Sequence, residues 1–439
     1  MKKLTNNKPL KIYFVGYALA HYFNDFLNKL QFHCNAEITV FTYKESERFI
    51  GEGVYQTFDN IDFKVIELQN TTERIANYYP RFEIGKFKSP SYNYLNGLDT
   101  YISSNHPDII VASGAYMQMY LYNNSIKAAI RKANTKLVFR TIPFQQLSYD
   151  VLLAQESKYL KPLELNSLPR LLRYFTETLG IDKLYYNKVR KRTLLRNVYS
   201  KRKLFNFPDA HACYVPSGIR IYTSYGVPNH KIHIMLNSPD TDKLLNQNNI
   251  VNNYENFKKD PFRIVHVGRL IKRKKVDLLL KALRETQKIE PRLNLVIIGN
   301  GPEKEDLKNL TKELELSSSV NFKGGVYDPL ELAQEMKQAS VYVLAGMGGL
   351  SLNEAMCFEL PIICSVCDGS EEYLVKHGEN GYIFKEDDEN DLSQKILKIL
   401  MNPSLQKQMS KNSIEIIEEE INIHTVCENY KNLFYSLVK

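Results

Sequence analysis

A chain of 439 residues that is 44% hydrophobic and 24% charged has ordinary globular composition, which excludes a disordered protein. At roughly 100–200 residues per domain, it is long enough for two or three domains. No stretch approaches the roughly 18–20 apolar residues of a membrane-spanning helix, and no apolar signal core precedes Lys11. The six cysteines are scattered, so we expect reduced thiols and a cytoplasmic protein.

Buried runs alternate with helical stretches through the first half of the chain. Residues 12–15 form an apolar run that ends at Gly16, and a helix is expected over 18–30. Further strands are expected at 38–41, 108–112, 136–139, 210–215 and 231–235, and a helix at 124–133. This alternation is typical of a parallel, doubly wound α/β sheet.

The alternation restarts after an asparagine-rich stretch that has no periodicity. We expect strands at 263–267, 293–298, 320–323, 340–344 and 361–364, and a helix at 276–286. The predicted organisation is therefore two Rossmann-like α/β domains facing a cleft, over 1–240 and 255–418, with a linker at 241–254 and a C-terminal segment at 419–439. Ligands of such sheets bind beyond the carboxyl ends of the strands.

Three loops at expected strand ends have the composition of a phosphate site. After Gly268, the cations Arg269 and Lys274 follow the strand at 263–267. A guanidinium group can pair with two phosphate oxygens, and an ammonium group acts as a point charge. The alternative is a solvated basic loop. A Gly-x-Gly turn containing Asn300 and Gly301 follows the next strand, and it lacks the third glycine of a dinucleotide fingerprint.

The third loop is rich in glycine and leads into a helix expected to begin near Ser351. Free N–H groups at a helix N-terminus suit an anion. Glu354 lies three residues after Ser351, and two interpretations of this spacing stay open. The pair forms a capping box, or Glu354 accepts hydrogen bonds from a sugar diol.

Taken together, the loops "HVGRL…K", "VIIGNGPE", "VNFKG" and "GGLSLNEAM…ELPIICS" resemble the retaining glycosyltransferases of glycosyltransferase family 4, which have the GT-B fold. The resemblance is specific over about residues 205–385 and mostly topological over 1–200. It implies that the N-terminal domain binds an acceptor and the C-terminal domain a nucleotide-sugar donor. It also implies that the last helix, about 424–437, packs back on the N-terminal domain.

The resemblance also assigns roles to individual positions. Arg269 and Lys274 match the cations that hold the donor diphosphate, and Glu354 matches the glutamate that binds the ribose hydroxyls. These three are the expected catalytic residues, with no metal and no cofactor besides the nucleotide-sugar substrate. The expected substrate-binding positions are Gly16, Gly268, Asn300, Gly301, Gly346, Gly348, Gly349, Leu350 and Ser351.

The sequence departs from the family pattern at Gly346, where relatives carry a first glutamate that touches the donor sugar. A second departure is Arg140, which follows a strand where many relatives carry a histidine. The expected activity is transfer of a sugar to a hydroxyl in bacterial surface polysaccharide, capsule, lipopolysaccharide or glycolipid synthesis. The alternative is a weak or inactive GT-B homologue that acts as a partner of an active glycosyltransferase. No motif supports a GT-B epimerase or phosphorylase.

The net charge of +9 equals that of one segment, residues 170–203, which holds eleven basic and two acidic residues. Leucine and aromatic residues are interleaved with these charges. Such a segment suits an anionic membrane surface, which would place the protein at the inner face of the membrane beside a lipid-linked acceptor. A solvated basic face and, less favoured, nucleic acid are the alternatives.

Overall fold

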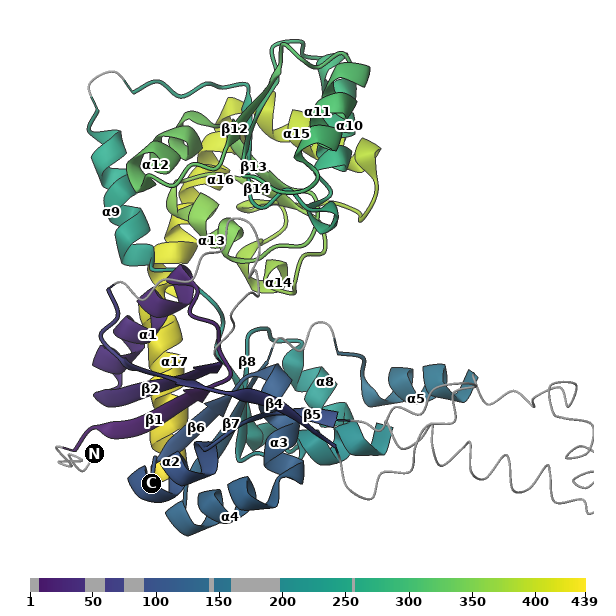
Figure 1. Cartoon of the computed structure of the whole chain (residues 1–439). Coiled ribbons are helices and arrows are strands. Elements are labelled where there is room, and N and C mark those ends of the chain that lie inside the picture. The colour runs from purple at the N-terminus through teal and green to yellow at the C-terminus, as the bar shows by residue number, and fades with distance from the viewer. Residues whose placement is uncertain (1–7, 44–59, 75–90, 142–145, 159–197, 255–256) are drawn as a thin grey trace, which may run out of the picture.

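The computed structural model describes residues 8–43, 60–74, 91–141, 146–158, 198–254 and 257–439. These residues form two α/β units, each built on a parallel sheet, and they lie one above the other in Figure 1. Among them, no helix is long and apolar enough to cross a membrane.

The first sheet has seven parallel strands, in the order β3-β2-β1-β6-β7-β8-β9. The apolar runs expected in this half of the chain all form strands of the sheet. The edge strand β3 was missed because its sequence, KVIEL, is only partly buried. In chain order the strands are β1 (Leu10–Val15), β2 (Ala36–Tyr43), β3 (Lys64–Leu68), β6 (Ile109–Ala112), β7 (Lys136–Thr141), β8 (Ala210–Cys213) and β9 (Ile232–Ile234).

Alternating side chains of this sheet pack against helices on opposite faces. Ile12 and Phe14 of β1 share a core with α1 (His21–His33), whereas Tyr13 and Val15 share a core with α2 (Leu98–Asn105). A separate antiparallel hairpin joins β4 (Asn70–Arg74) to β5 (Ser91–Leu95). The other helices among the described residues of this unit are η1 (Gly114–Tyr116), α3 (Met117–Tyr122), α4 (Asn124–Ala133), α5 (Tyr149–Lys158), α8 (Gly218–Ser224) and η4 (Asn229–Lys231).

The second sheet has six parallel strands, in the order β12-β11-β10-β13-β14-β15. The five strands expected here are present, and the short edge strand β15 was missed. The strands are β10 (Arg263–Val267), β11 (Asn294–Ile298), β12 (Val320–Gly324), β13 (Val341–Leu344), β14 (Ile362–Cys364) and β15 (Gly381–Ile383). The helices are η5 (Lys272–Lys274), α10 (Val276–Gln287), α11 (Lys304–Glu313), α12 (Pro329–Gln338), α13 (Leu350–Cys357), α14 (Glu371–Leu374), α15 (Glu389–Leu400), α16 (Pro403–Glu415) and η6 (Ile416–Glu420).

The segment expected to be a linker is instead a helix, α9 (Thr241–Asn252). Asp240 caps its N-terminus by accepting a hydrogen bond from the backbone N–H of Lys243. The helix packs against α12 and α13, and its contacts include polar ones, such as the bond from the buried Asn248 amide to Glu359 at 3.0 Å. Val251 of α9 also lies in the core of the second unit, but the buried polar Asn248 interrupts the apolar period that would predict the helix.

The last helix, α17 (Ile423–Val438), returns to the first unit and lies along α1 (Figure 1). Its apolar stripe, including Tyr430 and Phe434, is buried in the same core as α1 and β1. At its start, the backbone N–H of Ile423 donates to Thr241 Oγ1, and His424 Nε2 lies 2.9 Å from Asp242. The helix therefore packs where the resemblance placed it, and it also contacts the start of α9.

Candidate functional site

Three of the expected loops meet at the carboxyl edge of the second sheet. β10 lies between β11 and β13, and Val267 at its end pairs in register with Ile298 of β11. The chain leaves β10 toward β11 and later returns to add β13 on the other side. Such a reversal of strand order separates the loops and is where α/β sheets bind ligands. The loops that begin at Gly268, Gly299 and Ala345 lie at this edge.

Lys274 stands at the centre of these loops. It ends the turn η5, and its Nζ lies 3.6 Å from the position that a Cβ of Gly268 would occupy and 3.0 Å from that of Gly348. Burial lowers the pKa of this ammonium group, while Asp368 and Glu354 act in the opposite direction. No carboxylate of the described chain lies within ion-pair distance of it. A partly buried cation without an ion pair can receive an anion.

The other expected cation, Arg269, is partly buried at the same edge. Its Nε is buried and has no hydrogen-bond partner among the residues that the structure describes. Native structures leave few buried donors unpaired, so such a group points to an unfilled partner.

His266, on β10, is a neighbour that the sequence did not single out. Its Nδ1 lies 2.9 Å from the carbonyl oxygen of Val343, which fixes Nδ1 as the donor and Nε2 as an acceptor. Nε2 is 3.6 Å from the position of a Gly268 Cβ, on the side of Lys274. Burial lowers the pKa of His266 to about 4, so the ring is neutral at pH 7. It is the first residue of the motif "HVGRL…K", but it was not assigned a role from the sequence.

The glycines of the second loop pack against the first loop. A Cβ on Gly299 would overlap the carbonyl oxygen of Gly268, and one on Gly301 would overlap the backbone of Leu270. Backbone hydrogen bonds from Leu270 to Asn300 and from Gly268 to Ile298, both 2.9 Å, join the two loops. The side chain of Asn300 accepts a hydrogen bond from Lys304 at 2.9 Å. These glycines therefore serve loop-to-loop contact, which spacing alone could not distinguish from contact with a ligand.

Gly346 has a similar place in the third loop. A Cβ at this position would overlap the carbonyl oxygen of Arg273 and lie 2.8 Å from the carbonyl carbon of Lys274. The next residue, Met347, donates its backbone N–H to the same Arg273 oxygen at 2.9 Å. The loop after β13 thus lies directly on the turn that carries Lys274.

The helix α13 begins at Leu350, with Gly349 as its N-cap and no side-chain cap. Ser351 is its second residue, so Ser351 and Glu354 do not form a capping box, which requires the serine at the N-cap. The N–H groups of Leu350 and Ser351 belong to the first turn and have no intrahelical acceptor. Glu354 lies one turn further, and burial raises the pKa of its carboxyl to about 7, against the effect of Lys274.

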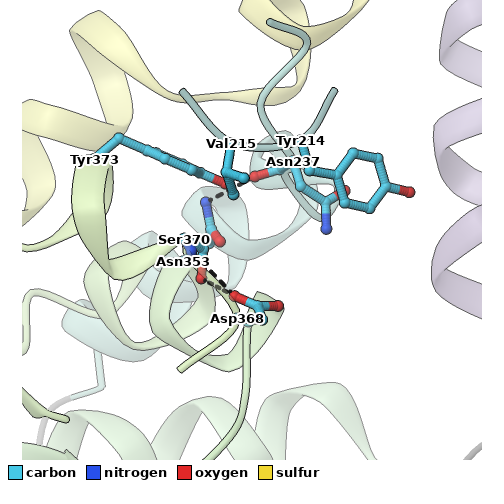
Figure 2. A pocket seen from close by; sticks show the side chains of 8 residues that line it. Tyr214, Val215, Asn237, Asn353, Asp368, Ser370 and Tyr373 are labelled. Atoms are coloured by element: carbon cyan, nitrogen blue, oxygen red, sulfur yellow. Dashed lines mark hydrogen bonds between the residues drawn. The ribbon is translucent and has the colours of Figure 1, made fainter. Parts of the chain in front are cut away.

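A pocket joins this edge to the first unit (Figure 2). Tyr214 and Asn237 precede α9 in the chain, and Asn353 of α13 donates to the carbonyl oxygen of Asn237 at 3.4 Å. The lining residues are Tyr214, Val215, Asn237, Gly349, Asn353, Asp368, Ser370 and Tyr373.

Gly16 and Arg140 make contacts within the first unit and with the last helix, α17. A Cβ on Gly16 would overlap the ring of Tyr116, and the Gly16 carbonyl accepts from Ser113 Oγ at 2.8 Å. The Arg140 guanidinium lies 4.5 Å from the Tyr214 ring centre, and its Nε donates to the Tyr430 hydroxyl at 2.9 Å. Residues 170–197 of the basic segment 170–203 lie outside the residues that the structure describes.

The part of the chain that contains these loops is similar to known proteins. Residues 248–416 match the family model "Glycosyl transferases group 1". An uncharacterized glycosyltransferase of Haemophilus influenzae is 35% identical over 173 residues, 39% of this chain and 48% of that protein. A poly(ribitol-phosphate) alpha-N-acetylglucosaminyltransferase of Staphylococcus aureus is 24% identical over 205 residues, 46% of this chain and 41% of that protein. The chain thus spans less than half the length of these relatives.

The similarity to solved structures extends over both units. Anabaena HepE, solved in complex with UDP, superposes with a TM-score of 0.63 at 15% identity, covering 97% of this chain and all of that one. The chain has the GT-B fold. The described residues hold no group of three His, Cys, Asp or Glu side chains placed to bind a metal ion.

Proposed function

We propose that the chain is a retaining glycosyltransferase that moves a hexose-like sugar from a nucleoside diphosphate to a hydroxyl acceptor. Lys274 carries the proposal, because it is a partly buried cation at the carboxyl edge of the second sheet and has no ion pair among the residues that the structure describes. Arg269, with its unpaired Nε, adds a second cation, and the first turn of α13 adds backbone donors. Together they would hold the diphosphate and neutralise the charge that develops as it leaves.

Glu354 would complete the donor site by accepting hydrogen bonds from the ribose hydroxyls. The match of residues 248–416 to group 1 glycosyl transferases supports this assignment, and so does the UDP complex of HepE, a structure of the same fold. We assign the donor to the second unit, residues 255–418, and the acceptor to the first, residues 1–240. The proposed chemistry uses no metal and no cofactor.

The product is proposed to be a bacterial surface polysaccharide or a glycolipid, made at the inner face of the membrane. The relative that acts on poly(ribitol-phosphate) supports a surface polymer as acceptor. The basic segment 170–203 would attract anionic lipid and the phosphates of a lipid-linked acceptor.

A screen of nucleotide sugars for hydrolysis and transfer by the full chain tests the proposal. We expect Arg269→Ala and Lys274→Ala each to lower turnover about 10²-fold, since each loses a contact that strengthens as the diphosphate leaves. Lys272→Ala is the matched control, because Lys272 is exposed in the same turn. Near-normal turnover by the first two variants would contradict the phosphate site. Nucleotide binding by a folded wild type that turns over no donor would favour the inactive partner.

A further inference from the structure

A carboxylate that the sequence did not single out lies at the start of α13. Asp368 follows β14, whose neighbour in the sheet is β13, so the loop after β14 reaches the same edge as the glycine-rich loop. Asp368 lines the pocket between the two units together with Gly349 and Ser370 (Figure 2).

One oxygen of this carboxylate is held in place and the other points at the helix. Oδ1 accepts hydrogen bonds from the Ser370 hydroxyl at 2.5 Å and from the Ser370 backbone N–H at 3.1 Å. Oδ2 lies only 2.5 Å from the position that a Cβ of Gly349 would occupy. Only glycine at residue 349 therefore lets Asp368 approach the N-terminus of α13 this closely.

Lys274 and Asp368 stand beside consecutive residues. The Lys274 ammonium nitrogen is 3.0 Å from the position that a Cβ of Gly348 would occupy. Asp368 Oδ2 is 2.5 Å from the corresponding position at Gly349. Burial lowers the pKa of Lys274, and the negative charge of Asp368 opposes this shift, as a nearby opposite charge does. The start of α13 is thus flanked by a cation on one side and a carboxylate on the other.

A diphosphate held by Lys274 and the first turn of α13 would leave its sugar beside this carboxylate. Carboxylate oxygens accept hydrogen bonds from hydroxyl groups and cannot donate them when ionised. The carbonyl oxygen of Arg273 already lies where a Cβ of Gly346 would be, so that position cannot supply such a group without moving the turn.

We propose that Asp368 accepts hydrogen bonds from hydroxyls of the donor sugar and so determines which sugar is used. This inference rests on the proposed function and adds to it the residue that recognises the sugar. Ser370 is the positioning residue, because its two hydrogen bonds fix the orientation of the carboxylate.

The test compares Asp368→Asn with Asp306→Asn, which removes an exposed carboxylate on α11, far from this loop in the sequence. Calorimetry with UDP and steady-state kinetics with the best nucleotide sugar of the panel are run on both. We expect Asp368→Asn to leave UDP affinity within about twofold and to lower kcat/KM for the sugar donor about 10- to 100-fold. Asp306→Asn should change neither.

Deoxy-sugar donors give a readout that a purely structural role would not move. In the wild type, a donor that lacks the hydroxyl contacted by Asp368 should have a much lower kcat/KM than the complete donor. In Asp368→Asn, the two donors should have nearly equal kcat/KM values, because the contact is already lost. Ser370→Ala should give an intermediate loss. Equal losses from each deoxy donor in wild type and Asp368→Asn would overturn the inference. A wild type that neither binds UDP nor uses any donor would instead refute the proposed function.

Discussion

Replacing Glu354 by Gln tests whether nucleotide binding depends on the charge of this residue. Burial in α13 raises the pKa of the Glu354 carboxyl to about 7, so about half of the molecules are protonated there at pH 7. The ionised carboxylate can accept a hydrogen bond from each ribose hydroxyl with a different oxygen, whereas protonation turns one of these oxygens into a donor and removes the charge that strengthens both bonds. Binding should therefore favour the ionised form and lower this pKa. Gln keeps the size of the side chain and does not titrate.

The pKa sets the magnitude of the effect. With a value of about 7, the ionised fraction of Glu354 rises from about one tenth at pH 6 to about nine tenths at pH 8. The wild-type affinity for UDP should rise about tenfold over this range through this group alone. The diphosphate also titrates in this range. Glu354→Gln binds the same ligand but lacks the Glu354 carboxyl, so the pH dependence of its affinity gives the contribution of the diphosphate alone.

Isothermal titration calorimetry at pH 6, 7 and 8 measures both affinities. Buffers of different ionisation enthalpy should show that the wild type releases about half a proton more than the variant at pH 7. Parallel pH profiles for the two proteins, with equal proton release, would refute the reasoning and remove Glu354 from the nucleotide site.

Two further predictions concern the loop contacts and the basic segment. Gly346→Ala should lower the free energy of unfolding by about 1–3 kcal/mol in urea titrations, because the added Cβ meets the Arg273 carbonyl oxygen. Gly114→Ala is the control and should change this free energy little, because a Cβ there meets open space. Equal losses in the two variants would contradict the contact at Gly346. The chain should sediment with anionic vesicles at low salt and far less with neutral ones, and changing residues 190–192, Arg-Lys-Arg, to Glu should abolish this binding. Full binding by that variant, or equal binding to neutral vesicles, would leave the segment a solvated face.

The strands could be predicted from the sequence because most are short buried apolar runs that end at turns. The misses have specific causes. The edge strand β3 carries Lys64 and Glu67 among its apolar residues, and an edge strand needs only partial burial. The helix α9 packs Leu244, Leu245 and Val251 against the core of the second unit, but the polar Asn248 is buried among them and interrupts the apolar period.

The structure brings the predicted cations and the predicted acid to one edge of the second sheet, and their roles there stay predictions. Arg269 and Lys274 follow the end of β10, and Glu354 lies in the helix after β13, so their nearness could be predicted from the strand order, whereas their roles rest on the family resemblance. A glycine in such a loop has the same appearance in sequence whether it faces a ligand or another backbone. Asp368 was missed because its loop has no glycine-rich pattern and its contact is made across Gly349.

The contacts of Gly299, Gly301 and Gly346 with neighbouring backbone fix the position of Lys274. Gly299 and Gly301 lie against the loop after β10, and Gly346 lies against the turn that carries Lys274, so each loop is held by the backbone of another. Lys274 is consequently placed before any ligand arrives, and binding a diphosphate need not order the loop around it. Fixed charges aimed at a leaving group stabilise it without reorganisation at the moment of reaction. A substitution that separates these loops should therefore impair turnover even where it touches no ligand, because it moves the cation on which the proposed chemistry depends.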